Sequence, residues 1–89
     1  MTKQEQHSKQ LSRPEWRAKR IEILERDSHA CRNCGKTQSL QIHHRQYHTY
    51  RGTEVIVNLW DYPDYLLVTL CNECHGAGHA TYSIPEFLI

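Results

Sequence analysis

The sequence predicts a small α+β domain stapled by a bound metal ion. With 89 residues, the chain is one domain at most and buries too little surface for a large core. Two C-x-x-C pairs can each grip a tetrahedral metal from a tight turn, and so can make up for the missing core. Helical patterning precedes the first pair, and two short strand-like segments follow it.

Two regions differ in their expected order. Residues 1–11 are polar without apolar periodicity, so we expect a flexible N-terminal arm. Residues 12–89 should form a single domain. The chain opens without an apolar run that could serve as a signal peptide or membrane span, so we expect a cytoplasmic protein that does not contact membranes.

A helix should begin near Ser12. This residue can cap free backbone amides, Glu15 can bond back to it, and Pro14 suits the first turn. The helix should end near Arg26. Its expected core-facing residues are Trp16, Ile23 and Leu24.

Two strands are expected around the histidine pair. Residues 40–44 alternate between apolar and polar side chains and end in His43 and His44. Because neighbouring side chains on a strand point to opposite faces, these two histidines should have different roles. Residues 66–70 form an apolar run that we expect to be the second strand.

The remaining segments carry weaker signals. A short strand is expected at 55–57, a helix at 72–80, and an apolar tail at 83–89 that docks on the body. Most aromatic residues between the two main strands should pack over the thin core. These aromatic residues are Tyr47, Tyr50, Trp60, Tyr62 and Tyr65.

The four cysteines predict a structural zinc site. Four thiolates close a zinc coordination sphere, and nothing in the sequence directs the chain to an oxidising compartment where disulfides would form. A C-x-x-C-H haem-attachment pattern is the alternative at the second pair, but it would leave the first pair without a role. The predicted ligands are Cys31, Cys34, Cys71 and Cys74.

Four histidines form a second constellation. His75 and His79 are four residues apart, so they share one face of a helix. Together with His43 and His44 they offer three ligands for an ion with an open side, and one free imidazole. A neutral imidazole with a pKa near 6.5 suits a general base at neutral pH.

Positive charge is confined to the first part of the chain. Residues 1–51 hold all 11 Lys and Arg, whereas residues 52–89 hold none. A basic half of this kind is typical of a surface that binds a phosphate backbone, although a solvated helix face gives the same pattern.

The order and spacing of these motifs resemble the HNH endonucleases. The matching residues are Arg26-Asp27, Cys31-x-x-Cys34-Gly35, Leu40-Gln41-Ile42-His43-His44 and Leu67-Val68-Thr69-Leu70-Cys71-x-x-Cys74-His75-x-x-x-His79. The resemblance implies a ββα-metal core, in which two antiparallel strands and a helix hold a catalytic divalent ion (Mg, Mn, Ni or Zn). It also implies DNA as the partner, with a homodimer as one option.

The resemblance assigns individual roles. His43, His75 and His79 would hold the catalytic ion, His44 would be the general base, and Arg45 would steady the phosphate. One position departs from the family pattern: Leu66 stands where the family usually has an Asn that orients the base, and Asn58 or Asp64 are candidate substitutes. The alternative functions are a zinc-stapled DNA-binding module of HNH fold without catalysis, and a protein-interaction zinc knuckle.

Overall fold

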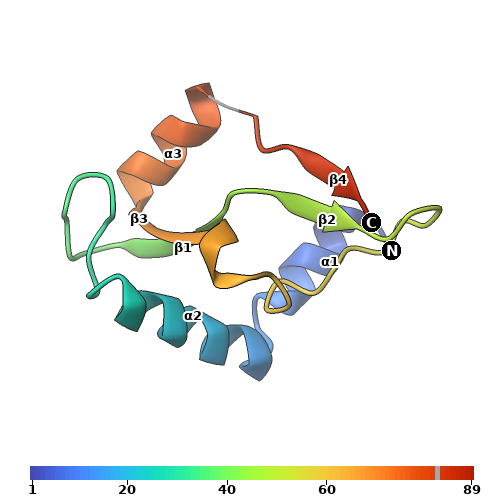
Figure 1. The fold of residues 1–89 in the computed structure, drawn as a ribbon, viewed down its shortest axis with the longest axis horizontal. Helices are drawn as coiled ribbons and strands as arrows, with labels where there is room; N and C mark the ends of the chain where they lie inside the picture. The colour runs from blue at the N-terminus through green and yellow to red at the C-terminus, as the bar shows by residue number, and fades with distance from the viewer. Residues whose placement is uncertain (82) are drawn as a thin grey trace.

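A two-stranded antiparallel sheet between two helices forms the centre of the protein (Figure 1). In this computed structural model, which describes residues 1–81 and 83–89, strand β1 (Leu40–His44) pairs with β3 (Leu67–Cys71). Helix α2 (Pro14–Arg26) packs on one face and α3 (Asn72–Thr81) on the other. The predicted small α+β fold is confirmed.

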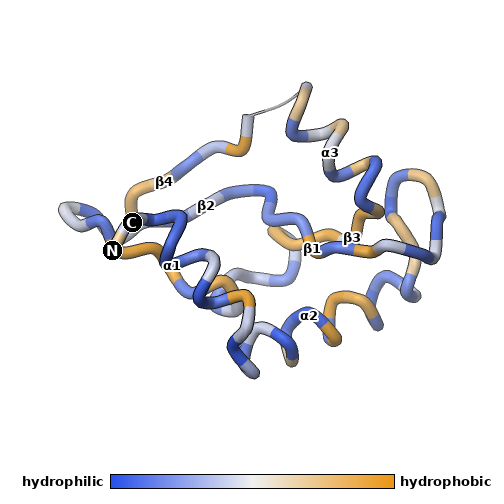
Figure 2. The backbone as a smooth tube through the Cα atoms, turned by 180° about the vertical axis from the view of Figure 1, so that it is seen from behind, coloured by the Kyte–Doolittle hydropathy of each residue, from blue (hydrophilic) through white to orange (hydrophobic). Residues whose placement is uncertain are grey.

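Helix α2 supplies the core from its apolar face. Trp16, Ile23 and Leu24 are buried, as predicted, and pack with Ile42 of β1 and Leu67 of β3. Figure 2 shows hydrophobic stretches, in orange, along α2, β1 and β3. Pro14 occupies the first turn, where its missing N–H costs no hydrogen bond.

The predicted Ser12 cap of α2 was wrong. The N-cap residue is Arg13, without a side-chain cap, and the Ser12 hydroxyl donates instead to the Lys9 carbonyl at 3.1 Å. Another helix ends just before Ser12, so the hydroxyl satisfies a free carbonyl at that end.

In place of the flexible arm expected for residues 1–11, the chain forms helix α1 (Lys3–Gln10). Thr2 caps it by accepting the Glu5 amide at 3.1 Å. No α1 residue is buried, so apolar periodicity could not reveal the helix. Hydrogen bonds and an ion pair to distant segments hold it, including Lys3 with Glu86 at 2.7 Å.

The segment between the two central strands differs most from expectation. Strand β2 (Tyr47–Thr49) pairs in parallel with β4 (Glu86–Leu88). The strand predicted at 55–57 is reduced to one bridge, between Thr49 and Ile56. A 3₁₀ turn, η1 (Asp64–Leu66), precedes β3, which therefore begins one residue later than predicted.

The tail docks mainly through its backbone, and of its apolar side chains Phe87 contacts the His48 ring, with centroids 6.2 Å apart. β4 pairs with β2, yet Phe87, Leu88 and Ile89 remain exposed. Of the aromatic residues expected to cover the core, Tyr62 is buried and Trp60 packs against the core, whereas Tyr50 and Tyr65 are exposed. Among the described residues, no helix is long and apolar enough to cross a membrane.

Asp27 fastens α2 to β3. Its side chain is fully buried and accepts hydrogen bonds from Arg26 at 2.9 Å, from Arg32 at 3.2 Å and from the Thr69 amide at 2.9 Å. Arg26 also donates to the Leu67 carbonyl at 2.7 Å. Burial alone would raise the pKa of Asp27, but the Arg26 guanidinium and the Thr69 amide hold it well below its ordinary value.

Replacing Asp27 with alanine should destabilise the fold by about 3 kcal/mol, because the Thr69 amide and Arg26 lose their acceptor. Since the folded pKa lies below the unfolded value of 3.8, this contribution is present above that pH and is lost as the pH falls through the folded pKa. Urea unfolding at several pH values measures it. Glu25→Ala, an exposed neighbour, should change stability by less than about 0.5 kcal/mol. Equal effects of the two changes would contradict the role of Asp27.

Candidate metal centres

Four cysteines converge where β3 meets α3. Cys31 and Cys34 lie in the loop after α2, Cys71 ends β3 and Cys74 lies in the first turn of α3. Their sulfur atoms all lie within 4.8 Å of one another. The Cys34 and Cys71 sulfurs are 3.6 Å apart, well beyond the roughly 2.05 Å of a disulfide. The predicted cysteine cluster is confirmed, and its four thiols can hold a metal ion.

Both cysteine pairs form the tight turns that metal knuckles use. The Cys34 amide points at the Cys31 sulfur, and the Cys74 amide points at the Cys71 sulfur, each at 3.5 Å. Gly35 closes the first turn with a φ of 83°, which other residues rarely adopt. Burial raises the pKa of Cys31, but backbone N–H groups around its sulfur outweigh burial and lower the pKa to about 6. A thiol that ionises this readily suits a cation.

Three histidines form a second cluster across β1 and α3. The ligand nitrogens of His43, His75 and His79 all lie within 4.8 Å of one another. Nε2 of His75 and Nε2 of His79 are 2.9 Å apart. Burial, followed by the two neighbouring imidazoles, lowers the pKa of His43 to about 4, and burial also lowers that of His75. All three sequence-predicted ligands are therefore brought together.

His43 carries an observation that fits an ion in this cluster. Its Nδ1 is buried and has no hydrogen-bond partner among the described residues. Buried polar atoms normally have a partner. The buried, neutral and unpaired nitrogen of His43 is free to bind an ion. Together with the two neighbouring imidazoles it forms a donor set that a divalent transition ion prefers.

Gln41 orients one of these histidines, and the sequence reasoning missed it. Its Oε1 lies in hydrogen-bond contact with Nδ1 of His75. An amide oxygen only accepts, so Nδ1 carries the proton and Nε2 keeps its lone pair for the cluster. Gln41 lies two residues before His43 on β1, so the alternation of the strand places both on one face.

His44 lies on the opposite face of β1 and is not part of the histidine cluster. It is 4% exposed, with Trp16 stacked at 5.3 Å and the Tyr62 ring edge-on at 4.9 Å. Its Nε2 is 3.1 Å from the Leu59 carbonyl. A carbonyl can only accept, so Nε2 carries the proton and Nδ1 bears the free lone pair. Burial lowers the pKa of His44 to about 4, although the bond to Leu59 acts in the opposite direction, so the expected pKa near 6.5 was wrong.

Two grooves border the histidine cluster. One, of about 310 Å³, is lined by both His44 and His75. The other, of about 570 Å³, is lined by His43 together with Arg32 and Arg45. His44 thus shares a groove with His75 of the cluster, although it lies on the face of β1 opposite to His43. The predicted phosphate-binding residue Arg45 lies in the other groove, beside His43.

Leu66 occupies the position where the HNH family usually has an Asn, and the loops around His44 contain the two candidate substitutes for that Asn. Leu66 lies in η1, where its carbonyl accepts the Arg45 amide at 2.8 Å. Of the two candidate substitutes, Asp64 pairs with Lys19 on α2, and its carbonyl accepts from Arg26 at 2.6 Å. Asn58 instead immediately precedes Leu59, the residue that bonds His44. Of the two, only Asn58 therefore adjoins the residue that bonds His44, and its own side chain bonds Gln10 and Asp61.

No family model, curated protein or solved structure matches this chain. The resemblance to the HNH endonucleases therefore stays a prediction. The function proposed below depends on the two clusters, on the contacts of His44 and on the two grooves.

Proposed function

We propose that this protein is a metal-dependent DNA endonuclease of the HNH type. The observation that carries the proposal is the convergence of three imidazoles from β1 and α3, one of which, His75, lines a groove together with a fourth. That fourth imidazole, His44, is held by Leu59 in the tautomer whose Nδ1 can accept a proton.

The two clusters suit different ions. Four sulfur ligands leave no open position, so the cysteine site would hold a structural zinc. Three imidazoles leave positions for solvent and phosphate, and Mg, Mn, Ni or Zn are the candidate ions for this site. When bound there, such an ion supplies positive charge near the oxygen that leaves phosphorus.

The residues of this chain would carry the remaining steps. Nδ1 of His44 takes a proton from water while the water oxygen bonds to phosphorus. The bond from phosphorus to the 3′ oxygen breaks, and that oxygen takes a proton from a solvent water, which gives 5′-phosphate and 3′-hydroxyl ends. Arg45 and Arg32 line the groove beside His43, where they would neutralise phosphate charge.

Cleavage of supercoiled plasmid DNA with added Mg, Mn, Ni or Zn tests this function. His79 is exposed and helical, so His79→Ala should remove a ligand without unfolding the chain. We expect cleavage to fall by more than the roughly 10- to 100-fold that loss of an outer-shell partner causes. His29→Asn changes an exposed histidine outside both clusters and should cleave normally, since Asn tolerates its φ of 53°. Absence of cleavage with every metal, or equal cleavage by His79→Ala, would refute the proposal.

The second candidate is a zinc-stapled DNA-binding module without catalysis. It is favoured by the placement of His44, which is 4% exposed and on the face of β1 away from the histidine cluster. This candidate predicts that the chain binds duplex DNA with strong salt dependence and does not cut it. Binding isotherms at several salt concentrations separate the two, because binding should then be equal in the wild type and in His79→Ala.

A further inference from the structure

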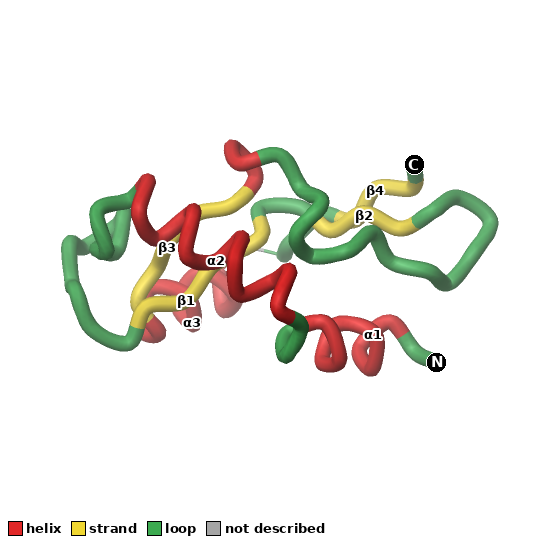
Figure 3. The backbone as a smooth tube through the Cα atoms, turned by 90° about the horizontal axis from the view of Figure 1, so that it is seen from below, coloured by secondary structure: helices red, strands yellow, loops and turns green. Residues whose placement is uncertain are grey.

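Helix α1 grips the loop of residues 54–59 with two glutamine side chains. Gln6 donates to the Glu54 carbonyl at 2.7 Å and accepts from the Ile56 amide at 3.0 Å. One helical turn later, Gln10 accepts from the Leu59 amide at 2.7 Å. Viewed from below (Figure 3), α1 lies alongside this loop. Helix α1 is thereby joined to the backbone of a loop about 50 residues further along the chain.

The contact of Gln10 leads directly to His44. Leu59 is 1% exposed, its amide donates to Gln10, and its carbonyl accepts from Nε2 of His44 at 3.1 Å. The N–H and C=O of Leu59 lie in neighbouring peptide planes joined by two rotatable bonds, and the buried Leu59 side chain limits rotation about them, so holding the amide also restricts the carbonyl. Gln10 further donates to Oδ1 of Asn58 at 3.3 Å, which holds the preceding residue as well.

We propose that Gln10 is a positioning residue for His44, acting through Leu59. The inference rests on the proposed role of His44 as the general base. An imidazole whose Nε2–H is held by a fixed carbonyl keeps Nδ1 free to accept a proton. If the loop of residues 54–59 moved away, His44 would also populate the other tautomer, which carries its proton on Nδ1. That tautomer cannot accept a proton from water at Nδ1.

Nitrogen-15 NMR of the His44 ring in the zinc-loaded full chain tests the proposal without relying on cleavage. In the wild type, Nε2 should carry the proton. In Gln10→Ala we expect a mixture of tautomers, and kcat for plasmid cleavage should fall about tenfold with little change in KM. Gln4→Ala makes the same change at an exposed position of α1 and should leave both measurements unchanged.

Gln10→Glu is the conservative variant. It keeps an acceptor for the Leu59 amide, so it should restore the wild-type tautomer of His44 and most of kcat. Melting temperatures check that all variants are folded. An unchanged tautomer in Gln10→Ala, or a Gln10→Glu that behaves like Gln10→Ala, would overturn the positioning role. If Gln10→Ala changes the tautomer of His44 but the wild-type chain cuts no DNA, the nuclease proposal is refuted and the positioning role of Gln10 stands.

Discussion

Removing the proposed zinc ion from the cysteine site is expected to unfold the whole chain. Binding of structural zinc is worth about 10–16 kcal/mol in small zinc domains, whereas total folding stability is typically about 5–15 kcal/mol. Cys71 is 0% exposed and joins β3 to α3, so Cys71→Ser should have the same effect as a strong chelator. Far-UV circular dichroism during a chelator titration measures the transition, and re-addition of zinc should reverse it.

The histidine site supplies the control for this experiment. His79→Ala should lower the metal content from two ions per chain to one while the fold survives, and mass spectrometry under native conditions counts the ions. Cys74 and His75 are neighbours on α3, so losing the sulfur-bound ion should also separate the helical histidines from His43. A chain that still unfolds cooperatively without any metal would show that the core alone is sufficient.

Replacing His44 with alanine is expected to lower kcat by about 10²- to 10⁴-fold, the range for loss of a general base. KM should change little, because His44 is buried and offers little surface to DNA. Single-turnover cleavage of an end-labelled duplex measures the chemical step directly. Equal single-turnover rates for the wild type and His44→Ala would remove this imidazole from the reaction.

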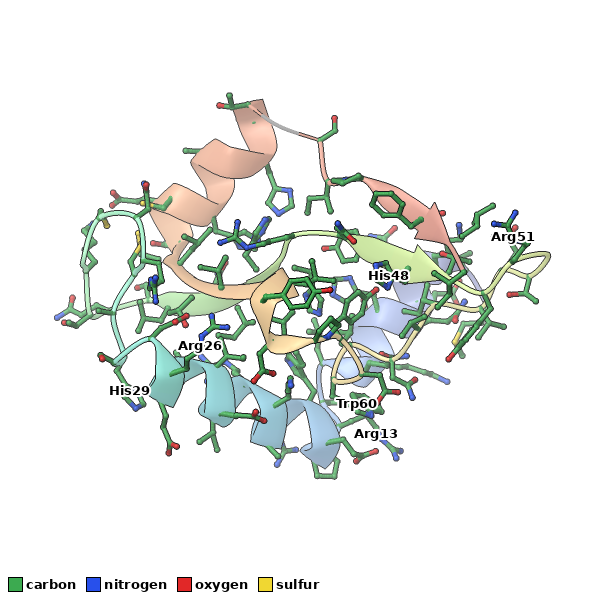
Figure 4. All side chains as sticks on the ribbon, viewed as in Figure 1. Arg13, Arg26, His29, His48, Arg51 and Trp60 are labelled. Carbon is green, nitrogen blue, oxygen red and sulfur yellow. The ribbon has the colours of Figure 1, made fainter. Side chains whose placement is uncertain are left out.

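His48 offers a matched control for the His44 variant. Like His44 it contacts the Tyr62 ring, with centroids 4.9 Å apart, but it belongs to β2 and lies outside the histidine cluster (Figure 4). His48→Ala should therefore lower the melting temperature by a similar amount and leave the rate nearly unchanged. A comparable loss of rate in both variants would point to general destabilisation of the fold.

The sequence predicts those elements that carry a pattern within their own residues. Helix α3 follows from the spacing of His75 and His79, and strand β1 follows from the alternation of Leu40–His44. Helix α1 could not be predicted, because its partners in other segments lie 48 to 83 residues away and its own residues are all polar. The parallel pairing of β2 with β4 is also non-local, and no pattern within either strand indicates it.

The candidate site follows the same division. Its side-chain ligands carry a signal in their spacing, so His75 and His79 could be paired from the sequence. The orienting group of His44 is the backbone carbonyl of Leu59, and a carbonyl has no sequence signature. The contact of Gln10 could not be predicted for a related reason, because the loop of residues 54–59 carries only weak sequence signals.

Because His43 and His44 point to opposite faces of β1, the register of this strand decides which of the two imidazoles faces α3. Leu40 pairs with Cys71 and His44 with Leu67, and a shift of this register by one residue would exchange the faces of His43 and His44. A single-residue insertion inside β1, between Leu40 and His43, would therefore preserve every ligand and still place the wrong imidazole against α3. An insertion of two residues at the same place would keep the orientation.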